Sequence, residues 1–483
     1  MTLPIFRITD ILLYERPVRL RIPFRFGVVT LHEAPQAFVS LRITLADGRS
    51  ASGAAAELMV PKWFDKDPAL SNEQNFAQLR YSLQNAAVAY ADKENRSAFG
   101  HSAAHHAALV GQGAKQGLNA LVASYGPALL DRAVIDALCR LLNLPFAAAV
   151  QRNLFGLDAT LTPDLSGLDF TKWLAGLQPA RHLAARHTVG LLDALAEADL
   201  SAAGRLNDGL PETLEGAIAA YGLRWFKLKV GGNRQDDIDR LRAIAAVLDR
   251  LPEPYQASLD GNEQYDDVDG IAALWQAMRG DVQFTRLCGS IRYIEQPIKR
   301  AAALDKPVER LSREIPFIID ESDADYDVFP LARALGYRGI SSKTCKGIYR
   351  ALLNAARCRV WNAEAGEARY FVTGEDLTCQ AGLALQQDLA LVAVLGLGHV
   401  ERNGHHYVDG FGAAPAAEQQ AFQAGHPDLY TFRNGRARLA IRDGQMILDS
   451  ILDTPGFASA VEPDWSSLTA MSISDFRNQG QKQ

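Results

Sequence analysis

The sequence is poor in cysteine, and its few cysteines show no pairing pattern. The 483 residues include five cysteines, which stand far apart at positions 139, 288, 345, 358 and 379. Small secreted domains carry dense, even sets of cysteines, and zinc or redox sites carry closely spaced pairs. The cysteine usage argues against these classes, and we expect a reduced, cytoplasmic protein.

An excess of positive charge is also lacking, as are long apolar runs. Lys and Arg number 50 against 56 Asp and Glu, so the formal net charge is −6. Proteins that bind nucleic acid or anionic membranes usually present a basic surface. No run of about 18 apolar residues could span a bilayer, and the start of the chain does not resemble a secretory signal. We therefore expect no nucleic-acid or membrane partner.

The first part of the chain has the pattern of an α+β domain. Ala37–Leu45 alternates apolar with polar residues and leads into a hairpin turn at Ala46–Gly48. Helical spacing prevails from about 71 to 150, where Leu130–Leu142 is amphipathic and is stopped by Asn143–Pro145. Strands followed by a run of helices predict an α+β unit.

Beyond an irregular connection at about 151–181, short apolar runs recur, and each ends in polar residues. These runs are His187–Leu191, Trp225–Lys229, Ser258–Asp260, Arg292–Glu295, Phe317–Asp320, Gly339–Lys343, Tyr370–Thr373 and Gly398–Glu401. Helix-like segments such as Asp236–Leu251 fill the gaps. About eight strands that alternate with helices predict a parallel sheet closed into a barrel. The tail differs, because Arg438–Ile447 is typical of another hairpin, around Asp443-Gly444.

Charged residues stand at the ends of five of these predicted strands. They are Lys227 with Lys229, Asp260, Glu295, Asp320 and Lys343, and from position 229 onward the intervals are 31, 35, 25 and 23 residues. In a parallel barrel, functional side chains lie where the strands end. Three carboxylates that converge would repel one another and raise each other's pKa unless a cation joined them. A hard divalent ion with oxygen ligands, such as Mg²⁺, meets this need.

The lysines predict acid/base chemistry beside that cation. Lys227 and Lys229 are two apart on one strand and so point to the same face, while Lys343 comes from a strand across the barrel. A cation could stabilise the enediolate that forms when a proton α to a carboxylate is removed. A lysine base must fall from a pKa of about 10.4 to roughly 7–8 to work at neutral pH. We expect burial, the metal and Lys227 to lower the pKa of Lys229.

At these residues the sequence resembles the muconate-lactonising-enzyme-like subgroup of the enolase superfamily. The motifs that carry the resemblance are Phe226–Gly231, Asp260–Asn262, Ile294–Pro297, Asp320–Ser322, Ser342–Lys343 and Lys346–Gly347. Their order, spacing and residue types agree over roughly 180–410. Lys343 argues against the mandelate-racemase-like relatives, which use a histidine–aspartate pair. Glu401–Asn403 stands where dipeptide epimerases carry Asp-x-Asp, which weakens that assignment.

The resemblance implies a fold and a set of roles. The fold is a modified TIM barrel, (β/α)7β, at residues 181–410, with an α+β capping domain at 1–180 that the C-terminal segment 411–483 completes. The implied Mg²⁺ ligands are Asp260, Glu295 and Asp320, with Mn²⁺ as the other candidate ion. The implied acid/base catalysts are Lys229 and Lys343, with Lys227 beside them. A small carboxylate substrate, cap loops that close over it and a homo-oligomer are also implied.

Other residues are candidates for supporting or substrate-binding roles. They are Asn262, Glu321, Glu375, Asp376 and Glu401. Glu321 is adjacent to Asp320, and the apolar strand before them gives no periodicity to choose the ligand; the family pattern favours Asp320. Lys346 is interpreted as structural, because it lies three residues past Lys343, where the strand has ended.

Several alternatives stay open at this point. The proton abstraction could lead to racemisation or epimerisation, cycloisomerisation or dehydration. A non-catalytic barrel used for binding or assembly and a metal-dependent aldolase or lyase are the other hypotheses. The loop Val60–Asp65 could be a specificity lid or a simple surface loop. His101 and His105 stand four apart on a predicted helix beside His106, but no acid accompanies them at a diagnostic spacing.

Overall fold

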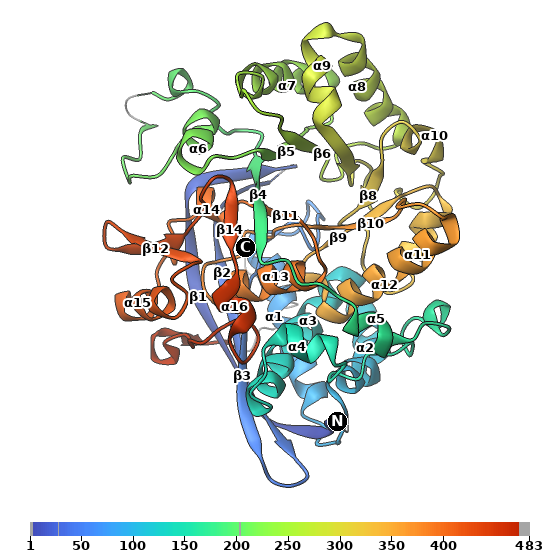
Figure 1. Ribbon diagram of the computed structural model, residues 1–483, viewed down its shortest axis with the longest axis vertical. Coiled ribbons are helices and arrows are strands. Elements are labelled where there is room, and N and C mark those ends of the chain that lie inside the picture. The colour runs from blue at the N-terminus through green and yellow to red at the C-terminus, as the bar shows by residue number, and fades with distance from the viewer. Residues whose placement is uncertain (1–2, 28, 202–203, 473–483) are drawn as a thin grey trace.

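The computed structural model describes residues 3–27, 29–201 and 204–472. The chain opens with an antiparallel sheet of long strands, in the order β15-β1-β2-β3 (Figure 1). Its first three strands are β1 (Phe6–Phe26), β2 (Val29–Leu45) and β3 (Ser50–Leu58). Thr44 pairs with Ser50 across the turn, and Gly48 N–H donates to the Leu45 carbonyl at 3.0 Å. The predicted hairpin is confirmed.

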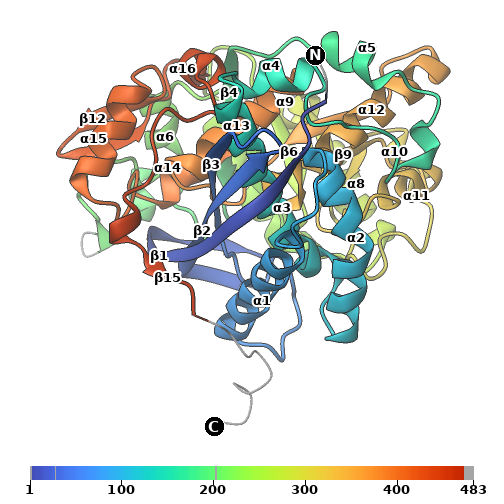
Figure 2. The same cartoon turned by 90° about the horizontal axis from the view of Figure 1, so that it is seen from below.

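Helices cover one face of this sheet, as Figure 2 shows for α1 and α3. The helices of this region are α1 (Asn72–Tyr90), α2 (Ala98–Lys115), α3 (Ala120–Leu141), α4 (Phe146–Gln151) and α5 (Phe170–Ala175). Helix α3 lies so close to β3 that a Cβ on Gly53 would stand 2.2 Å from the Ala133 carbonyl oxygen. The helix ends as predicted, because Asn143 turns to a φ of 50° just before Pro145.

Eight parallel strands close into a barrel within the described residues. They are β4 (His182–Val189), β5 (Trp225–Lys229), β6 (Gln256–Asp260), β7 (Ile291–Glu295), β8 (Phe317–Ile319), β9 (Gly339–Ser342), β10 (Phe371–Gly374) and β11 (His399–Arg402). Pairing of β11 with β4 completes the ring. The intervening helices are α6 (Leu214–Tyr221), α7 (Arg234–Leu248), α8 (Val268–Gly280), α9 (Thr285–Ser290), α10 (Glu309–Ser312), α11 (Val328–Ala334), α12 (Ile348–Ala365) and α13 (Leu383–Val394). The predicted (β/α)7β barrel with a separate cap is confirmed.

The strand register brings the charged strand ends to one level. Lys229 pairs with Asp260, and Asp260 pairs with Glu295 on the next strand. Glu295 in turn pairs with Ile318, two residues before Asp320. The three acids therefore follow one another around the rim of the barrel.

The tail contacts both regions. Its elements are α14 (Gly404–Tyr407), α15 (Ala416–Gly425), β12 (Tyr430–Arg433), β13 (Arg436–Leu439), β14 (Gln445–Ile447), α16 (Asp449–Asp453) and β15 (Thr469–Ala470). Strand β15 pairs with β1 of the cap, whereas β14 pairs antiparallel with β4 of the barrel. The turn at Asp443-Gly444 forms, with mutual 2.9 Å hydrogen bonds between Arg442 and Gln445, but β13 and β14 have other partners. The boundaries 1–180, 181–410 and 411–483 stay a prediction.

None of the helices in the described segments combines the length and the apolar character that crossing a membrane requires.

Candidate functional site

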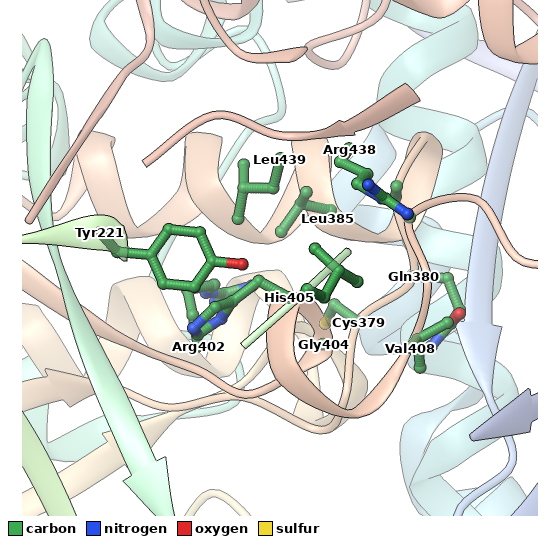
Figure 3. A pocket seen from close by; sticks show the side chains of 13 residues that line it. Tyr221, Cys379, Gln380, Leu385, Arg402, Gly404, His405, Val408, Arg438 and Leu439 are labelled. Atoms are coloured by element: carbon green, nitrogen blue, oxygen red, sulfur yellow. The ribbon is translucent and has the colours of Figure 1, made fainter. Parts of the chain in front are cut away.

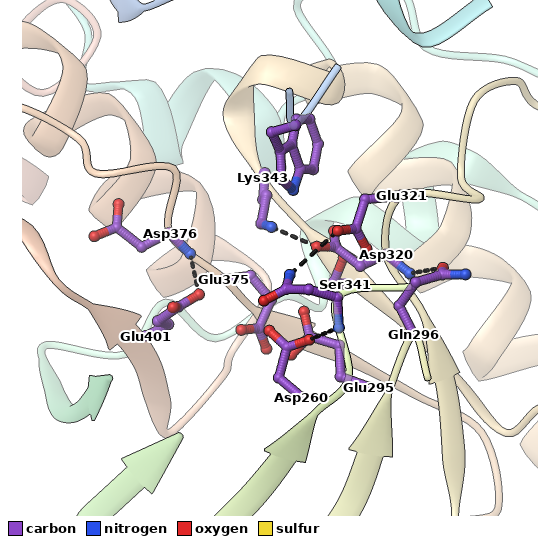
Figure 4. Close-up of polar contacts among 12 residues, drawn as sticks. Asp260, Glu295, Gln296, Asp320, Glu321, Ser341, Lys343, Glu375, Asp376 and Glu401 are labelled. Carbon is purple, nitrogen blue, oxygen red and sulfur yellow. Dashed lines mark hydrogen bonds and ion pairs between the residues drawn. The ribbon is translucent and has the colours of Figure 1, made fainter. Parts of the chain in front are cut away.

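Three buried carboxylates lie at the ends of three successive barrel strands. Asp260 ends β6, Glu295 ends β7 and Asp320 directly follows β8, and each side chain is fully buried. Figure 4 shows them gathered above the strand ends with Glu375 and Glu401. The structure thus brings together the three acids that the sequence predicted as metal ligands.

Two of these acids hold the two predicted catalytic lysines. Lys229 Nζ donates to Asp260 Oδ2 at 2.6 Å, and Lys343 Nζ donates to Asp320 Oδ2 at 2.5 Å. Burial alone would raise the pKa of Asp320, but Lys343 and Lys346 outweigh it and hold that pKa well below its ordinary value. The pKa of Asp260 is lowered in the same way, by Lys227 and Lys229 against burial. Both acids are therefore ionised at neutral pH.

Glu295 differs from Asp260 and Asp320 in its hydrogen bonding and in the direction of its pKa shift. Lys227 Nζ lies 2.8 Å from Glu295 Oε2, yet the angles are not those of a hydrogen bond, and both carboxylate oxygens lack a hydrogen-bond partner. Burial and the neighbouring Asp260 and Glu375 raise the pKa of Glu295 well above its usual value. A buried carboxyl in these surroundings is ionised only when a further cation compensates it.

The ligand atoms of the three acids are not drawn tightly together. Among the residues that the structure describes, the group of three His, Cys, Asp or Glu ligands whose atoms all lie within 4.8 Å of one another is a different one, Asp92, His101 and His105. The carboxylates of Asp260, Glu295 and Asp320 therefore lie less close together than that group, although the register places their strands next to one another.

Lys227 lies deeper in the barrel, among carboxylates. Its Nζ is within 2.9 Å of oxygens of Asp260, Glu295, Glu375 and Glu401. Burial would lower the pKa of Lys227, but these acids together raise it well above the ordinary value. Lys227 is thus a fixed positive charge in the barrel lumen.

Lys343 keeps its proton in this arrangement. Burial acts to lower the pKa of Lys343, but the Asp320 carboxylate and the acids near it outweigh burial and raise that pKa. This direct contact between Lys343 and Asp320 could not be foreseen from the sequence.

Lys229 and Lys343 face one pocket between barrel and cap. They come from β5 and from the end of β9, which are four strands apart in a ring of eight and hence opposite. The cap supplies an apolar wall, made of Phe24, Phe26, Val60 and Trp63. Lys343 Nζ lies 4.5 Å from the centre of the Trp63 ring, a cation–π distance.

The loop that carries Trp63 is held down on the barrel. Arg300 donates to the Trp63 carbonyl at 2.7 Å and to the Phe64 carbonyl at 2.9 Å, while it also binds Glu263. Lys66 donates to the Asn262 carbonyl at 2.6 Å. The loop Val60–Asp65 therefore packs on the barrel rim, with Val60 and Trp63 among the residues that line the pocket, and its role as a specificity lid stays a prediction.

The candidate supporting residues divide into two groups. Asn262, Asp376 and Glu401 line the pocket with the lysines. Glu375 does not line it, because its oxygens are taken by Arg186, Lys227, Thr373 and Tyr293 in the lumen. Glu321 accepts from Asn262 Nδ2 at 3.2 Å and from Lys66 at 3.3 Å, so it links the rim to the lid.

Three further residues contact Asp320, and two of them, Gln296 and Ser341, were assigned no role from the sequence. Gln296, at a φ of 31°, accepts from the backbone N–H of Asp320 at 2.8 Å and so fixes the end of β8. Ser341 donates to Asp320 Oδ1. Lys346 donates to the Ser341 carbonyl at 2.6 Å and lies 3.4 Å from Asp320 Oδ1. The interpretation of Lys346 as structural stays a prediction; the contact with Asp320 forms because the turn after β9 brings Lys346 back to the rim.

A second pocket lies behind the loops that follow β10 and β11 (Figure 3). It is lined by residues that include Tyr221, Cys379, Arg402 and His405, and none of its lining residues belongs to the pocket of the two lysines. The ion pair of Arg402 with Asp388 ties this region to α13. Neither Lys229 nor Lys343 lines this second pocket.

Comparison with known proteins identifies the fold. The sequence matches no protein-family model, and no curated protein matches it. Solved structures do match. A dipeptide epimerase from Enterococcus faecalis, in complex with Mg and L-Leu-L-Tyr, has a TM-score of 0.60 at 15% identity, over 94% of this chain and 99% of its own.

Two further structures agree with this. A muconate lactonizing enzyme from Mycobacterium smegmatis, in complex with muconolactone, has a TM-score of 0.59 at 17% identity, over 95% of this chain and 98% of its own. An enolase from Bradyrhizobium, in complex with magnesium and mandelic acid, has a TM-score of 0.56 at 16% identity, over 95% and 97%. These neighbours are members of the enolase superfamily, and the chain has their fold.

Proposed function

We propose that the chain is an enzyme that removes the proton α to the carboxylate of a small carboxylic acid, with a divalent cation at Asp260, Glu295 and Asp320. The observation that carries this proposal is the placement of Lys229 and Lys343 on opposite strands of the barrel, where both line one pocket. A substrate carbon held between them is within reach of an amine on each side.

The residues present fit a magnesium ion. The donor set consists of oxygen atoms alone, which Mg²⁺ and Mn²⁺ prefer and Zn²⁺ does not. Glu295 supplies two buried oxygens without a hydrogen-bond partner, which is a costly arrangement unless a cation is bound. When bound, the ion would supply positive charge for the substrate carboxylate. Two of the solved neighbours contain magnesium with a dipeptide or mandelic acid.

The chain's own groups move the proton. Asp320 keeps the proton on Lys343 Nζ in the present arrangement; when that carboxylate shares its charge with a cation, burial acts to lower the pKa of the amine. Lys229 Nζ donates a hydrogen bond to Asp260 Oδ2 on the opposite side. One lysine removes the α-proton, and the other returns a proton to the opposite face or stabilises the negative charge that develops.

This step is common to several reactions. Racemisation or epimerisation, cycloisomerisation and dehydration all begin with it, so the proposal covers an isomerase or a lyase. The Trp63 lid and the apolar wall from the cap exclude water from the reacting carbon. A homo-oligomer remains part of the proposal.

The test is an exchange screen in D₂O. The protein is incubated with MgCl₂ and with acid sugars, dipeptides, N-acylamino acids and lactones, and loss of the α-proton signal is followed by NMR. We expect exchange with at least one class and its loss when excess chelator removes the ion. Exchange that persists in chelator would contradict the metal, and no exchange with any class would contradict the proposed reaction.

A further inference from the structure

A second cluster of possible metal ligands lies in the cap, far from the barrel strands in the sequence. His101 and His105 are one turn apart on α2, and Asp92 lies in the loop between α1 and α2. One ligand atom from each residue lies within 4.8 Å of the other two. The sequence alone shows no acid at a diagnostic spacing from the histidines; the fold brings Asp92 to them from the preceding loop.

The tautomer of His101 leaves a nitrogen lone pair free. Its ring is fully buried, and its Nε2 lies 2.9 Å from the Phe6 carbonyl oxygen. A carbonyl only accepts hydrogen bonds, so the ring proton is on Nε2 and the lone pair is on Nδ1. His101 Nδ1 has no hydrogen-bond partner. Metal-binding histidines characteristically donate their other N–H to a carbonyl or carboxylate in this way.

His105 and Asp92 complete the donor set. His105 Nε2 lies 3.2 Å from Asp92 Oδ2 without the geometry of a hydrogen bond, and it too is buried and unpartnered. Burial lowers the pKa of both histidines, against the carbonyl of Phe6 at His101 and against Asp92 at His105, so both rings are neutral at pH 7. Burial acts to raise the pKa of Asp92, but the Glu94 N–H and Arg96 outweigh it, so Asp92 is ionised.

We propose that Asp92, His101 and His105 form a zinc site in the cap, separate from the cation site of the barrel. Two neutral imidazoles and one carboxylate are ligands typical of Zn²⁺, whereas Mg²⁺ prefers oxygen ligands alone. Asp92 and His105 are 25% and 14% exposed, which leaves a solvent path for a fourth ligand, a water molecule. The ion would tie the α1–α2 loop to α2 and, through the Phe6 carbonyl, to the first strand of the cap sheet.

Arg96 would compete with a bound cation for the Asp92 carboxylate, and its replacement therefore tests the proposal. Its Nη1 lies 2.7 Å from Asp92 Oδ2, the oxygen that also faces His105. A bound cation must displace this guanidinium, which is 27% exposed and can turn to solvent. Arg96→Gln should therefore tighten zinc binding, whereas a cluster held together only by its ion pairs would be loosened by the same change.

The experiment uses the full chain with MgCl₂ in excess, so that the all-oxygen site of the barrel is occupied. CoCl₂ is titrated as a spectroscopic probe, and ZnCl₂ then competes with it. We expect one equivalent of Co²⁺ with the intense visible absorption of a site that has nitrogen ligands and low coordination number. Asp92→Asn and His105→Asn should each weaken binding at least about tenfold.

His106→Asn is the matched control. His106 is on the same helix, and its Nε2 pairs with Asp325 Oδ1 at 2.7 Å instead of facing the cluster. The control should bind Co²⁺ like the wild type, and ZnCl₂ should raise the melting temperature of both but not that of His105→Asn. The proposal is overturned if the wild type shows no Co²⁺ band, or if His105→Asn and His106→Asn bind Co²⁺ equally.

Discussion

At the scale of single residues, Glu295 differs from the other two acids of the rim. Asp260 and Asp320 are each neutralised by a lysine at hydrogen-bond distance, whereas Glu295 has no hydrogen-bond partner. Its raised pKa and its position between the other two acids make it the residue at which a cation is most needed. Replacement of Glu295 should therefore affect cation affinity and the stability of the fold differently.

Glu295→Gln should weaken cation binding without harming the fold. The amide has the shape of the protonated carboxyl but cannot supply a negative charge, so we expect Mn²⁺ affinity to fall at least about tenfold, or about 1.4 kcal/mol. The melting temperature of the metal-free protein should be unchanged, because the amide replaces a buried carboxyl whose raised pKa keeps it protonated there. Electron paramagnetic resonance of free Mn²⁺ measures the affinity. Glu309→Gln, at an exposed pair with Arg313, is the control; equal affinities in the two variants would refute the ligand role.

Asp131 is a buried carboxyl in the cap whose charge opposes folding. It accepts hydrogen bonds from Tyr90 and Ser102, each at 2.8 Å. Burial outweighs these bonds and raises its pKa to about 7, from an ordinary value of 3.8. A group whose pKa is raised on folding stabilises the protein fully below its unfolded pKa, and this stability is lost as the pH rises through the folded pKa.

The free energy of unfolding should therefore fall, relative to that of Asp131→Asn, between about pH 4 and pH 7. One pKa unit corresponds to about 1.4 kcal/mol. The free energy of unfolding of the wild type, minus that of the variant, should therefore fall by on the order of 2–3 kcal/mol from pH 5 to pH 8. Urea unfolding at the two pH values measures it. A difference that stays constant with pH would show that Asp131 keeps an ordinary pKa.

At the scale of the elements, the lid depends on one arginine. Arg300 follows β7 and binds the carbonyls of Trp63 and Phe64, so it connects the barrel rim to the cap loop. Arg300→Ala should free this loop and lower kcat/KM roughly tenfold, because the pocket is no longer closed over the substrate. Steady-state kinetics on the substrate found by the exchange screen measures this. Arg313 is an exposed arginine that pairs with Glu309, and Arg313→Ala should leave kcat/KM unchanged. An equal loss of kcat/KM in both variants would contradict a specific role of Arg300 in closing the pocket.

The barrel strands were predictable because each is a short apolar run that ends in a polar residue. The pairing of the tail was not. Strand β14 has three residues, and nothing in its pattern indicates that it pairs with β4 of the barrel while β15 joins the cap. Such pairings depend on tertiary packing and not on local periodicity. For the same reason the sequence did not indicate that Asp92 lies beside His101 and His105, because these residues come together only in the folded cap.

At the scale of the whole molecule, the barrel supplies charge and the cap supplies apolar enclosure. The charged strand ends were predictable from their order and spacing, together with the resemblance that favoured Asp320 over Glu321. The pocket wall of Phe24, Phe26 and Trp63 was not, because these residues lie in another region of the chain and meet the barrel only after folding. The raised pKa of Lys343 was not predictable for a related reason, since it depends on the contact of this ammonium with Asp320. The site therefore combines charged strand ends of the barrel, which follow a pattern in the sequence, with apolar cap residues, which do not.

The most direct test of the central claim is α-proton exchange by the two lysine variants. With a substrate from the screen and MgCl₂ in D₂O, Lys229→Ala and Lys343→Ala should each lower the exchange rate by roughly 10²–10⁴, the usual contribution of a general acid or base. Lys299→Ala, an exposed lysine that pairs with Asp266, should exchange like the wild type. Exchange at the wild-type rate in both Lys229→Ala and Lys343→Ala would show that the opposed lysines are not the proton carriers.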